Sequence, residues 1–282
     1  MPDAPAPALA ITGSTGHLGG LVARHLAGDG VALRLLARAP ERAPELPGAV
    51  RVRSRYADDA ETRASLAGVM TLFLVSGSES ADRLDQHRAI VDAAASAGVS
   101  HIVYTSFFGA APDAVFTLAR DHWATEQHII ASGMTHTFLR NNFYLDVLPA
   151  FVGDDDVLRG PAGDGRVAAV ARADVARAAA VILADPASHA GVTYDLTGPE
   201  AITMAEAAEI IGARTGRDVR FHDETIPEAY ESRRRWEADP WQYDAWVSTY
   251  TAIAEGQLVP ATDDIHRLTG RRPLSLSELL AD

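Results

Sequence analysis

The 282-residue chain contains no cysteine and no lysine, so all 25 of its basic residues are arginine. Without cysteine it has no disulfide, no cysteine-ligated zinc or iron–sulfur site and no thiolate nucleophile. Without lysine it has no P-loop lysine, no Schiff base to pyridoxal phosphate and no lysine general base. These two absences exclude thiol enzymes, pyridoxal enzymes and P-loop nucleotide hydrolases.

Long hydrophobic runs and excess positive charge are missing as well. The longest clean apolar run, near residues 178–184, is too short to span a bilayer. Residues 1–5 include an acid where a secretory signal carries basic residues. With 38 acidic against 25 basic residues, the formal net charge of -13 repels phosphate backbones and anionic lipid surfaces. We therefore expect a cytoplasmic protein with no nucleic-acid partner and no membrane partner.

Metal-binding and hydrolase motifs are also absent from the sequence. The ten histidines show neither an HExxH motif nor the spacing of a facial triad, which predicts no metal site. No G-x-S-x-G motif is present, which argues against a serine hydrolase. The composition, with 47% hydrophobic and 22% charged residues, is that of an ordinary globular protein of about two domains.

The first half of the chain alternates short apolar runs with longer amphipathic stretches, which is typical of a parallel sheet flanked by helices. In the helical stretch 82–97, the residues Leu84, Val91 and Ala95 would line one face. We expect an α/β fold with a Rossmann-type doubly wound parallel sheet, forming an NADP-binding domain over residues 1–152. The expected strands are residues 8–12, 31–37, 50–53, 71–75, 101–105 and 135–140.

Further along the chain this alternation ends, and the sequence becomes rich in Gly and Asp. A helical run covers residues 174–184, and an apolar piece at 192–196 would return to the sheet. Thr203 is followed three residues later by Glu206, which is the spacing of a capping box at the start of a helix. We expect residues 153–282 to form a smaller, mainly helical substrate-binding domain.

Three glycines at spacings of three lie between the first expected strand and a helical stretch. Gly13, Gly16 and Gly19 would let the chain turn tightly, let backbone N–H groups approach a pyrophosphate and let the helix pack against the strand. A Gly-rich turn without a ligand is the alternative. The strand before the glycines and the helix after them favour a dinucleotide-binding loop.

The second expected strand ends near Arg38, where an NAD-preferring protein usually carries an acid that binds the ribose hydroxyls. An arginine there suits the 2′-phosphate of NADP, and Arg42 follows, while Glu41 could blunt the preference. The alternative for Arg38 is a solvated strand end. The sequence therefore predicts NADPH/NADP as the cofactor, bound more tightly than NADH.

Several short motifs, taken in order, resemble one family. Together they make most of the chain similar to the NmrA-like group of atypical short-chain dehydrogenase/reductases, and within it to the bacterial NADPH-dependent quinone oxidoreductases. The motifs are residues Ile11–Gly19, Arg38–Pro40, Val75–Ser78, Tyr104–Ser106, Leu139–Tyr144 and Ala171–Asp174.

This resemblance implies a set of cofactor contacts. Arg38 would bind the 2′-phosphate, and Arg172 would lie near the nicotinamide. The residues that would hold the pyrophosphate are Gly13, Ser14, Thr15, Gly16, His17 and Leu18. The residues that would flank the nicotinamide end are Ser76, Gly77, Ser78, Asn141, Asn142 and Phe143.

The pattern of strand ends agrees with these contacts. Ser76, Thr105, Ser106 and Asn141 lie at the carboxyl ends of expected strands, where hydroxyl and amide groups can reach ribose and carboxamide groups. Turns and N-caps favour Ser, Thr and Asn on their own account. For Thr105 and Ser106 the cofactor contact and the cap are equally weighted interpretations.

The wider dehydrogenase superfamily mostly uses a Tyr with a Lys four residues later, and a chain without lysine cannot have this pair. In the corresponding region, His122 and Glu126 lie one helical turn apart. His122 could act as a general acid oriented by Glu126, although a surface pair of structural value is the favoured interpretation. Tyr144, next to Phe143 after the expected nicotinamide turn, is the second catalytic candidate.

Aromatic residues gather between residues 230 and 250. Their flat rings suit a planar acceptor, but the core of a helical subdomain or a dimer contact is the favoured interpretation for most of them. The aromatic residues of this stretch are Tyr230, Trp236, Trp241, Tyr243, Trp246 and Tyr250.

The missing Tyr–Lys pair weakens the case for carbonyl reduction, in which an alkoxide must be protonated. It leaves quinone reduction intact, because water can protonate a hydroquinone anion and the site needs mainly a fixed nicotinamide and an apolar slot. We expect an NADPH-dependent oxidoreductase that acts on a quinone or a similar planar acceptor. The alternatives are a non-catalytic NADP(H)-binding redox sensor with a protein partner, and a biosynthetic reductase for an aromatic natural product.

Overall fold

The computed structural model describes residues 7–281 and contains a seven-stranded sheet in the order β3-β2-β1-β4-β5-β6-β9. The pairs β1–β2, β1–β4, β2–β3 and β4–β5 are parallel. The expected Rossmann-type fold and the return of residues 193–196 to the sheet are confirmed. The strands are β1 (Leu9–Ile11), β2 (Leu33–Ala37), β3 (Ala49–Arg53), β4 (Thr71–Leu74), β5 (His101–Phe107), β6 (Thr135–Asn141) and β9 (Thr193–Leu196).

Helices connect these strands and recur through the rest of the described chain. None of the helices described between residues 7 and 281 is long and apolar enough to cross a bilayer. The α-helices are α1 (His17–Gly28), α2 (Ala60–Leu66), α3 (Arg83–Ser96), α4 (Thr117–Ala131), α5 (Arg172–Ala184), α6 (Met204–Thr215), α7 (Ile226–Arg233), α8 (Pro240–Ala254), α9 (Asp264–Thr269) and α10 (Leu276–Leu279). The short 3-10 helices are η1 (Pro40–Arg42), η2 (Leu145–Phe151) and η3 (Pro186–His189).

The described chain divides into two compact units, each assembled from segments that are distant in sequence. The structure thus divides the chain differently from the sequence analysis, which places one boundary after residue 152. The unit limits fall within β5, α4, β6, α5 and β9, because these elements continue from one unit into the next. The first unit contains the residues up to Ser106, Trp123–Leu139 and Val175–Tyr194, and the second contains Phe107–His122, Arg140–Asp174 and the residues from Asp195 onward.

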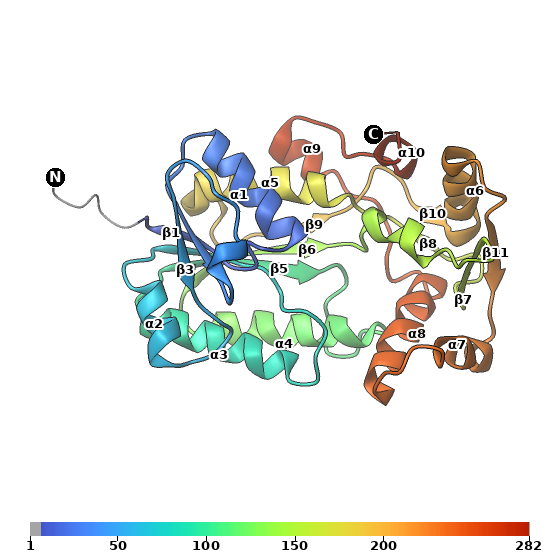
Figure 1. Ribbon diagram of the computed structural model, residues 1–282, viewed down its shortest axis with the longest axis horizontal. Helices are drawn as coiled ribbons and strands as arrows, with labels where there is room; N and C mark the ends of the chain where they lie inside the picture. Colours follow the sequence, from blue (N-terminus) through green and yellow to red (C-terminus); the bar gives the residue numbers. More distant parts are fainter. Residues whose placement is uncertain (1–6, 282) are drawn as a thin grey trace. The chain divides into compact units, whose positions relative to one another are not determined.

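The first unit has helices on both faces of its strands, with α1 and α5 over one face and α2, α3 and α4 over the other (Figure 1). Every residue of β2 and β4 is buried, as expected for parallel strands that are covered on both sides. On the α3 side, Leu72, Leu74 and Ile102 of the strands pack with Ile90 and Val91 of the helix.

The buried face of α3 differs in part from the expected one. The sequence analysis places Leu84, Val91 and Ala95 on this face; Val91 is buried and Ala95 packs partly buried against the same core, whereas Leu84 is partly exposed. The stripe that faces the core instead begins with Arg83 and His87. Polar residues occupy this stripe because they hydrogen-bond to the segment after β4, which a hydrophobic pattern cannot reveal.

The second unit contains two small sheets and the helices α6 to α10. The expected capping box of α6 is confirmed, since the Thr203 hydroxyl accepts the Glu206 N–H at 3.0 Å and the Glu206 carboxylate accepts the Thr203 N–H at 2.8 Å. The core of the second unit combines buried residues of the small sheets with those of α6 and α8, such as Leu158, Met204 and Ile253. The small sheets pair β7 (Val157–Gly160) with β11 (Arg220–Asp223) and β8 (Arg166–Val167) with β10 (Ile202–Thr203).

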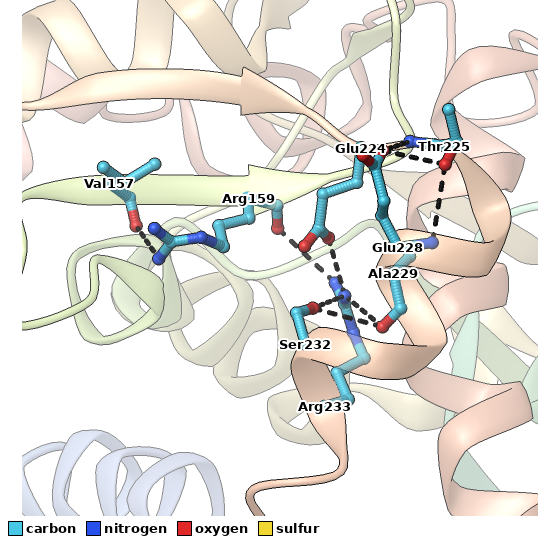
Figure 2. A network of polar contacts seen from close by, with 8 residues as sticks. All are labelled: Val157, Arg159, Glu224, Thr225, Glu228, Ala229, Ser232 and Arg233. Atoms are coloured by element: carbon cyan, nitrogen blue, oxygen red, sulfur yellow. Dashed lines mark hydrogen bonds and ion pairs between the residues drawn. The ribbon is translucent and has the colours of Figure 1, made fainter.

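A buried ion pair fastens α7 to the β7–β11 sheet. Arg233 Nη1 lies 2.8 Å from Glu224 Oε2, and only 8% and 3% of the two side chains are exposed. Figure 2 shows the Arg233 guanidinium reaching back to the carbonyl oxygens of Ala229 and Arg159, at 2.8 Å and 3.4 Å. It also lies 5.2 Å from the centroid of the Tyr250 ring. The pair is therefore hydrogen-bonded on several sides, which offsets the cost of burying its charges.

The strand order of the first unit predicts the place of a ligand-binding crevice. From β1 the chain moves outward through β2 to β3 and then returns to place β4 on the other side of β1. Neighbouring strands whose connections leave in opposite directions open a crevice beyond their carboxyl ends, where ligands of such sheets bind. In this chain the crevice is bordered by the residues after Ile11 and the residues after Leu74.

Candidate functional site

Two glycines, one in the loop after β1 and one in the first turn of α1, do not tolerate a side chain. Gly13 has a φ of 60°, in the left-handed region, and a Cβ there would lie 3.1 Å from the Cβ of Val75. A Cβ on Gly19 would lie 2.4 Å from the carbonyl oxygen of Gly13. The N–H of Gly16 donates to the same carbonyl oxygen at 2.9 Å and closes the turn. Helix α1 therefore packs directly on this turn.

The amino-terminal end of α1 is open to solvent. Its N-cap, Gly16, provides no capping side chain, and its first turn contains no acidic residue. Thr15 and His17 are exposed and Leu18 is buried, while the buried Ser14 hydroxyl donates to a β2 carbonyl at 3.2 Å. The side chain of Ser14 thus fixes the loop, and the first N–H groups of the helix can receive an anion.

Thr12 links the carboxyl ends of β1 and β4. Its Oγ1 accepts the N–H of Val75 at 2.9 Å and lies 2.7 Å from the hydroxyl of Tyr56, which also contacts the Val75 carbonyl. Burial raises the pKa of Tyr56 to about 12, so the hydroxyl stays protonated at neutral pH. The sequence analysis missed Tyr56, because only the fold brings the residues after β3 to this crevice.

Arg38 follows the last residue of β2 and is exposed. Within residues 7–281 its guanidinium forms no hydrogen bond and no ion pair, and the exposed Glu41 does not pair with it. Its positive charge lowers the pKa of Tyr56, although burial, which raises this pKa, is the larger effect. The charge of Arg38 therefore acts at the position of Tyr56 beside the crevice. An arginine that is not engaged elsewhere can bind a phosphate through two parallel hydrogen bonds.

Three consecutive backbone N–H groups of the segment after β4 donate to side chains from three separate parts of the first unit. Arg83 adds a fourth contact, since its Nε donates to the Gly77 carbonyl at 3.0 Å. This segment, residues 75–78, therefore has a fixed backbone beside the glycine loop. The three acceptors are Thr12 Oγ1 for Val75 at 2.9 Å, Thr105 Oγ1 for Ser76 at 2.7 Å and His87 Nε2 for Gly77 at 2.8 Å.

The sequence reveals neither the hydrogen bond that Thr105 makes nor the burial of His87. Thr105 is buried, and its hydroxyl accepts the N–H of Ser76, which lies 29 residues earlier in the sequence; a contact of Thr105 with the cofactor stays a prediction. His87 is fully buried on α3, and its Nδ1 lies 2.9 Å from Thr125 Oγ1. The sequence analysis missed His87, although it lies one turn after Arg83 on the same helix. Ser78 is exposed at the end of the segment.

The interpretation of His122 and Glu126 as a surface pair is wrong, because both side chains are buried in α4. The carboxylate of Glu126 accepts a hydrogen bond of 2.5 Å from the Ser106 hydroxyl, at the end of β5. The ring of His122 lies 6.1 Å from the ring of Phe107. A general-acid role for His122 stays a prediction.

In the second unit, Asn141 and Asn142 follow each other at the end of β6 and are both buried. Both polar atoms of the Asn142 side chain have a partner, since its Oδ1 accepts the N–H of Phe143 at 2.7 Å and its Nδ2 donates to the Leu258 carbonyl at 3.1 Å. Asn141 differs, because its Oδ1 has no hydrogen-bond partner within residues 7–281. A buried acceptor without a partner is costly in a folded protein and is therefore suited to a ligand donor.

Tyr144 lies next to this free acceptor. Its hydroxyl accepts a hydrogen bond from Asn141 Nδ2 at 3.1 Å, and the Arg172 guanidinium lies 4.6 Å from its ring centroid. The backbone N–H of Arg172 donates to Asp146 at 2.9 Å. Burial raises the pKa of Tyr144 above its ordinary value, so the phenol keeps its proton at neutral pH. The structure thus brings together two predicted residues of different roles, Asn141 and Tyr144, and places Arg172 beside them.

The aromatic stretch has mixed surroundings. Tyr250 is buried in the core of the second unit, which confirms the core interpretation for this residue. Trp246 packs edge-on against Trp236 and Tyr243, with ring centroids 6.2 Å and 5.7 Å away, and Trp236 is 48% exposed.

Among the described residues, no group of three or more His, Asp or Glu side chains could hold a metal ion.

Comparisons with known proteins agree with this geometry. A model of the NmrA-like family matches residues 6–233. The chain is 32% identical over 278 residues to quinone oxidoreductase 2 of Escherichia coli K12, with 96% of each chain covered. It is 29% identical over 274 residues to an NAD(P)H azoreductase of Xenophilus azovorans, with 95% of each covered. The structure of an Escherichia coli NADPH-dependent quinone oxidoreductase with NADPH matches with a TM-score of 0.88 and 30% identity, over 97% of this chain and 98% of that one.

Proposed function

The chain belongs to the NmrA-like family, and from this premise we propose that it is an NADPH-dependent reductase of quinones or similar planar, conjugated acceptors. The observation that carries the proposal is the exposed, unengaged Arg38 in the same unit as a glycine loop that leaves no room for side chains. The names of two relatives that match nearly the whole chain support the acceptor class, since quinones and azo compounds are both planar and conjugated.

The residues of the first unit fit NADPH. Gly13 and Gly19 keep the turn free of Cβ atoms, so the first N–H groups of α1 would bind the pyrophosphate. Arg38 would bind the 2′-phosphate, which NADH lacks. The fixed segment 75–78 would border the same dinucleotide along the crevice. When bound, NADPH supplies the hydride for the reduction.

The resemblance to the family assigns residues of the second unit to the nicotinamide and to proton transfer. Asn141 Oδ1 would accept a hydrogen bond from the carboxamide, which would satisfy its missing partner. Tyr144 would donate its hydroxyl proton to the oxygen or nitrogen of the acceptor that gains electrons and would then recover a proton from water. Asn141 Nδ2 already donates to the Tyr144 oxygen, which stabilises the phenolate that this step leaves. The reaction would thus run without a Tyr–Lys pair.

The test is the loss of NADPH absorbance when the purified protein is mixed with benzoquinones, naphthoquinones and an azo dye, with NADH run in parallel. We expect turnover with several of these acceptors and a clear preference for NADPH. Tight NADPH binding with no turnover of any acceptor would overturn the proposal in favour of a redox sensor. The expectations of a cytoplasmic location and of no nucleic-acid partner stay predictions from the sequence, and so does the homodimer that is one interpretation of the aromatic residues between 230 and 250.

A further inference from the structure

His87 is a buried histidine that uses both of its ring nitrogens. Its Nε2 accepts the N–H of Gly77 at 2.8 Å, so this nitrogen must carry a lone pair. The proton of the neutral ring is therefore on Nδ1, from which it points to Thr125 Oγ1 at 2.9 Å. Burial, helped by the charge of Arg83, lowers the pKa of His87 to about 3 and keeps the ring neutral. The contacts thus select one tautomer.

The backbone that His87 holds lies at the crevice between β1 and β4. A Cβ on Gly13 would lie within 3.1 Å of Val75, so the glycine loop and the segment 75–78 are already in close contact. Gly77 lacks a side chain, and a Cβ there would lie 3.3 Å from His87 Nε2. The close approach of His87 to the Gly77 backbone therefore depends on this glycine. A small shift of the segment would change the width of the crevice.

A merely space-filling role would not require an imidazole. Leucine would fill much of the same volume, but it would leave the N–H of Gly77 without an acceptor in a partly buried position. Glutamine offers a carbonyl oxygen to Gly77 and an amide N–H to Thr125, which are the two functions that the observed tautomer performs. The hydrogen bonds of the side chain at position 87, rather than its volume, therefore hold the Gly77 backbone.

We infer that His87 is a positioning residue of the dinucleotide site, which as the Nδ1–H tautomer holds the Gly77 N–H and so fixes the segment 75–78 beside the glycine loop. The inference rests on the proposed function, because it assumes that this crevice binds NADPH. It adds a residue on α3 that acts through the backbone of another element and has no direct contact with the cofactor.

The experiment compares NADPH binding, followed by nicotinamide fluorescence, in the full-length wild type and three variants. His87→Leu should weaken binding about tenfold, because a hydrogen bond of the fixed segment is lost. His87→Gln should bind within about threefold of the wild type, since its amide restores both contacts. The matched control is His128→Gln, which changes a partly exposed histidine that pairs with Asp92 on the surface of the same unit. Its binding should be unchanged.

The outcomes separate the inference from the proposed function. A wild type that does not bind NADPH overturns the proposed function and the inference with it. A wild type that binds NADPH while folded His87→Leu binds equally well overturns only the inference. If His87→Leu does not fold, the ¹⁵N chemical shifts of the wild-type His87 ring decide the matter. Protonated Nδ1 and unprotonated Nε2 support the inference, and the opposite tautomer overturns it.

Discussion

A Cβ on Gly19 would lie 2.4 Å from the carbonyl oxygen of Gly13, so the first turn of α1 and the loop before it are in direct backbone contact. This distance is shorter than side chains tolerate, and the opposing atom belongs to the backbone, which cannot simply rotate away. Residue 19 must therefore be glycine for the amino-terminal end of α1, and with it the N–H groups of its first turn, to keep this position.

We expect Gly19→Ala to weaken NADPH binding by about a hundredfold or more, because α1 must move away from the loop to accommodate a methyl group. The matched control is Gly28→Ala at the other end of the same helix, where an added Cβ meets no atom within 4 Å. This control should bind normally and gain up to about 1 kcal/mol of stability from its helix propensity. Titration calorimetry and urea unfolding measure both effects, and equal binding by the two variants would refute the packing argument.

Arg38→Ala should raise the Kd for NADPH about 10- to 100-fold and leave the Kd for NADH unchanged, because only NADPH carries a 2′-phosphate. Arg88→Ala removes another exposed arginine of the same unit and serves as the control for the change in net charge. Comparable affinities for the two cofactors in the wild type, unaltered in the variant, would remove the basis for an NADPH preference.

Tyr144→Phe should lower kcat about tenfold or more with little change in the KM for NADPH, because the variant lacks the proton that the reduced acceptor needs. Since burial raises the pKa of Tyr144, the wild-type kcat should stay flat from about pH 7 to about pH 9. Tyr230→Phe, which loses an exposed hydrogen bond to Asp244, is the control. If water alone protonates the product, Tyr144→Phe will retain the wild-type kcat.

The buried His87 predicts a loss of stability in mild acid. Its pKa of about 3 in the folded state lies below the ordinary value of 6.5, so the unfolded chain binds more protons between these values. The free energy of unfolding should therefore fall as the pH decreases below 6.5, and this one group accounts for about 2 kcal/mol between pH 7 and pH 5. Urea unfolding at several pH values should show a flatter dependence in His87→Gln, and identical pH dependence in both proteins would contradict the assignment.

The ion pair of Glu224 and Arg233 should contribute far more to stability than its neighbour on the surface. Glu224→Gln leaves a buried guanidinium without its counter-charge and should cost about 3–5 kcal/mol. The pair of Arg234 and Glu231, at 2.8 Å but with about 70% of each side chain exposed, is the control, and Glu231→Gln should cost at most about 1 kcal/mol. Chemical denaturation of both variants measures the difference, which would vanish if burial did not strengthen the pair.

Much of the sheet could be predicted from the sequence because parallel strands are short, apolar and separated by amphipathic helices. The glycine loop and Arg38 could also be predicted from the sequence, since both lie directly after a strand in the sequence. Tyr56 and His87 were not, because their partners lie 44 and 10 residues away and no motif joins them. The prediction for α3 was right for Val91 and Ala95 but missed Arg83 and His87, which occupy core-facing positions that hydrophobic periodicity assigns to apolar residues.

The interleaved course of the chain has a consequence for attempts to dissect the protein. A fragment that stops at residue 152 would carry Phe108, Leu145 and Leu148, whose packing partners in the core of the second unit include Met204 and Tyr250. These side chains would meet water in such a fragment, which favours aggregation over an isolated nucleotide-binding module. Limited proteolysis should accordingly yield nicked chains that stay associated, because the segments of each unit are held together by packing as well as by the peptide backbone.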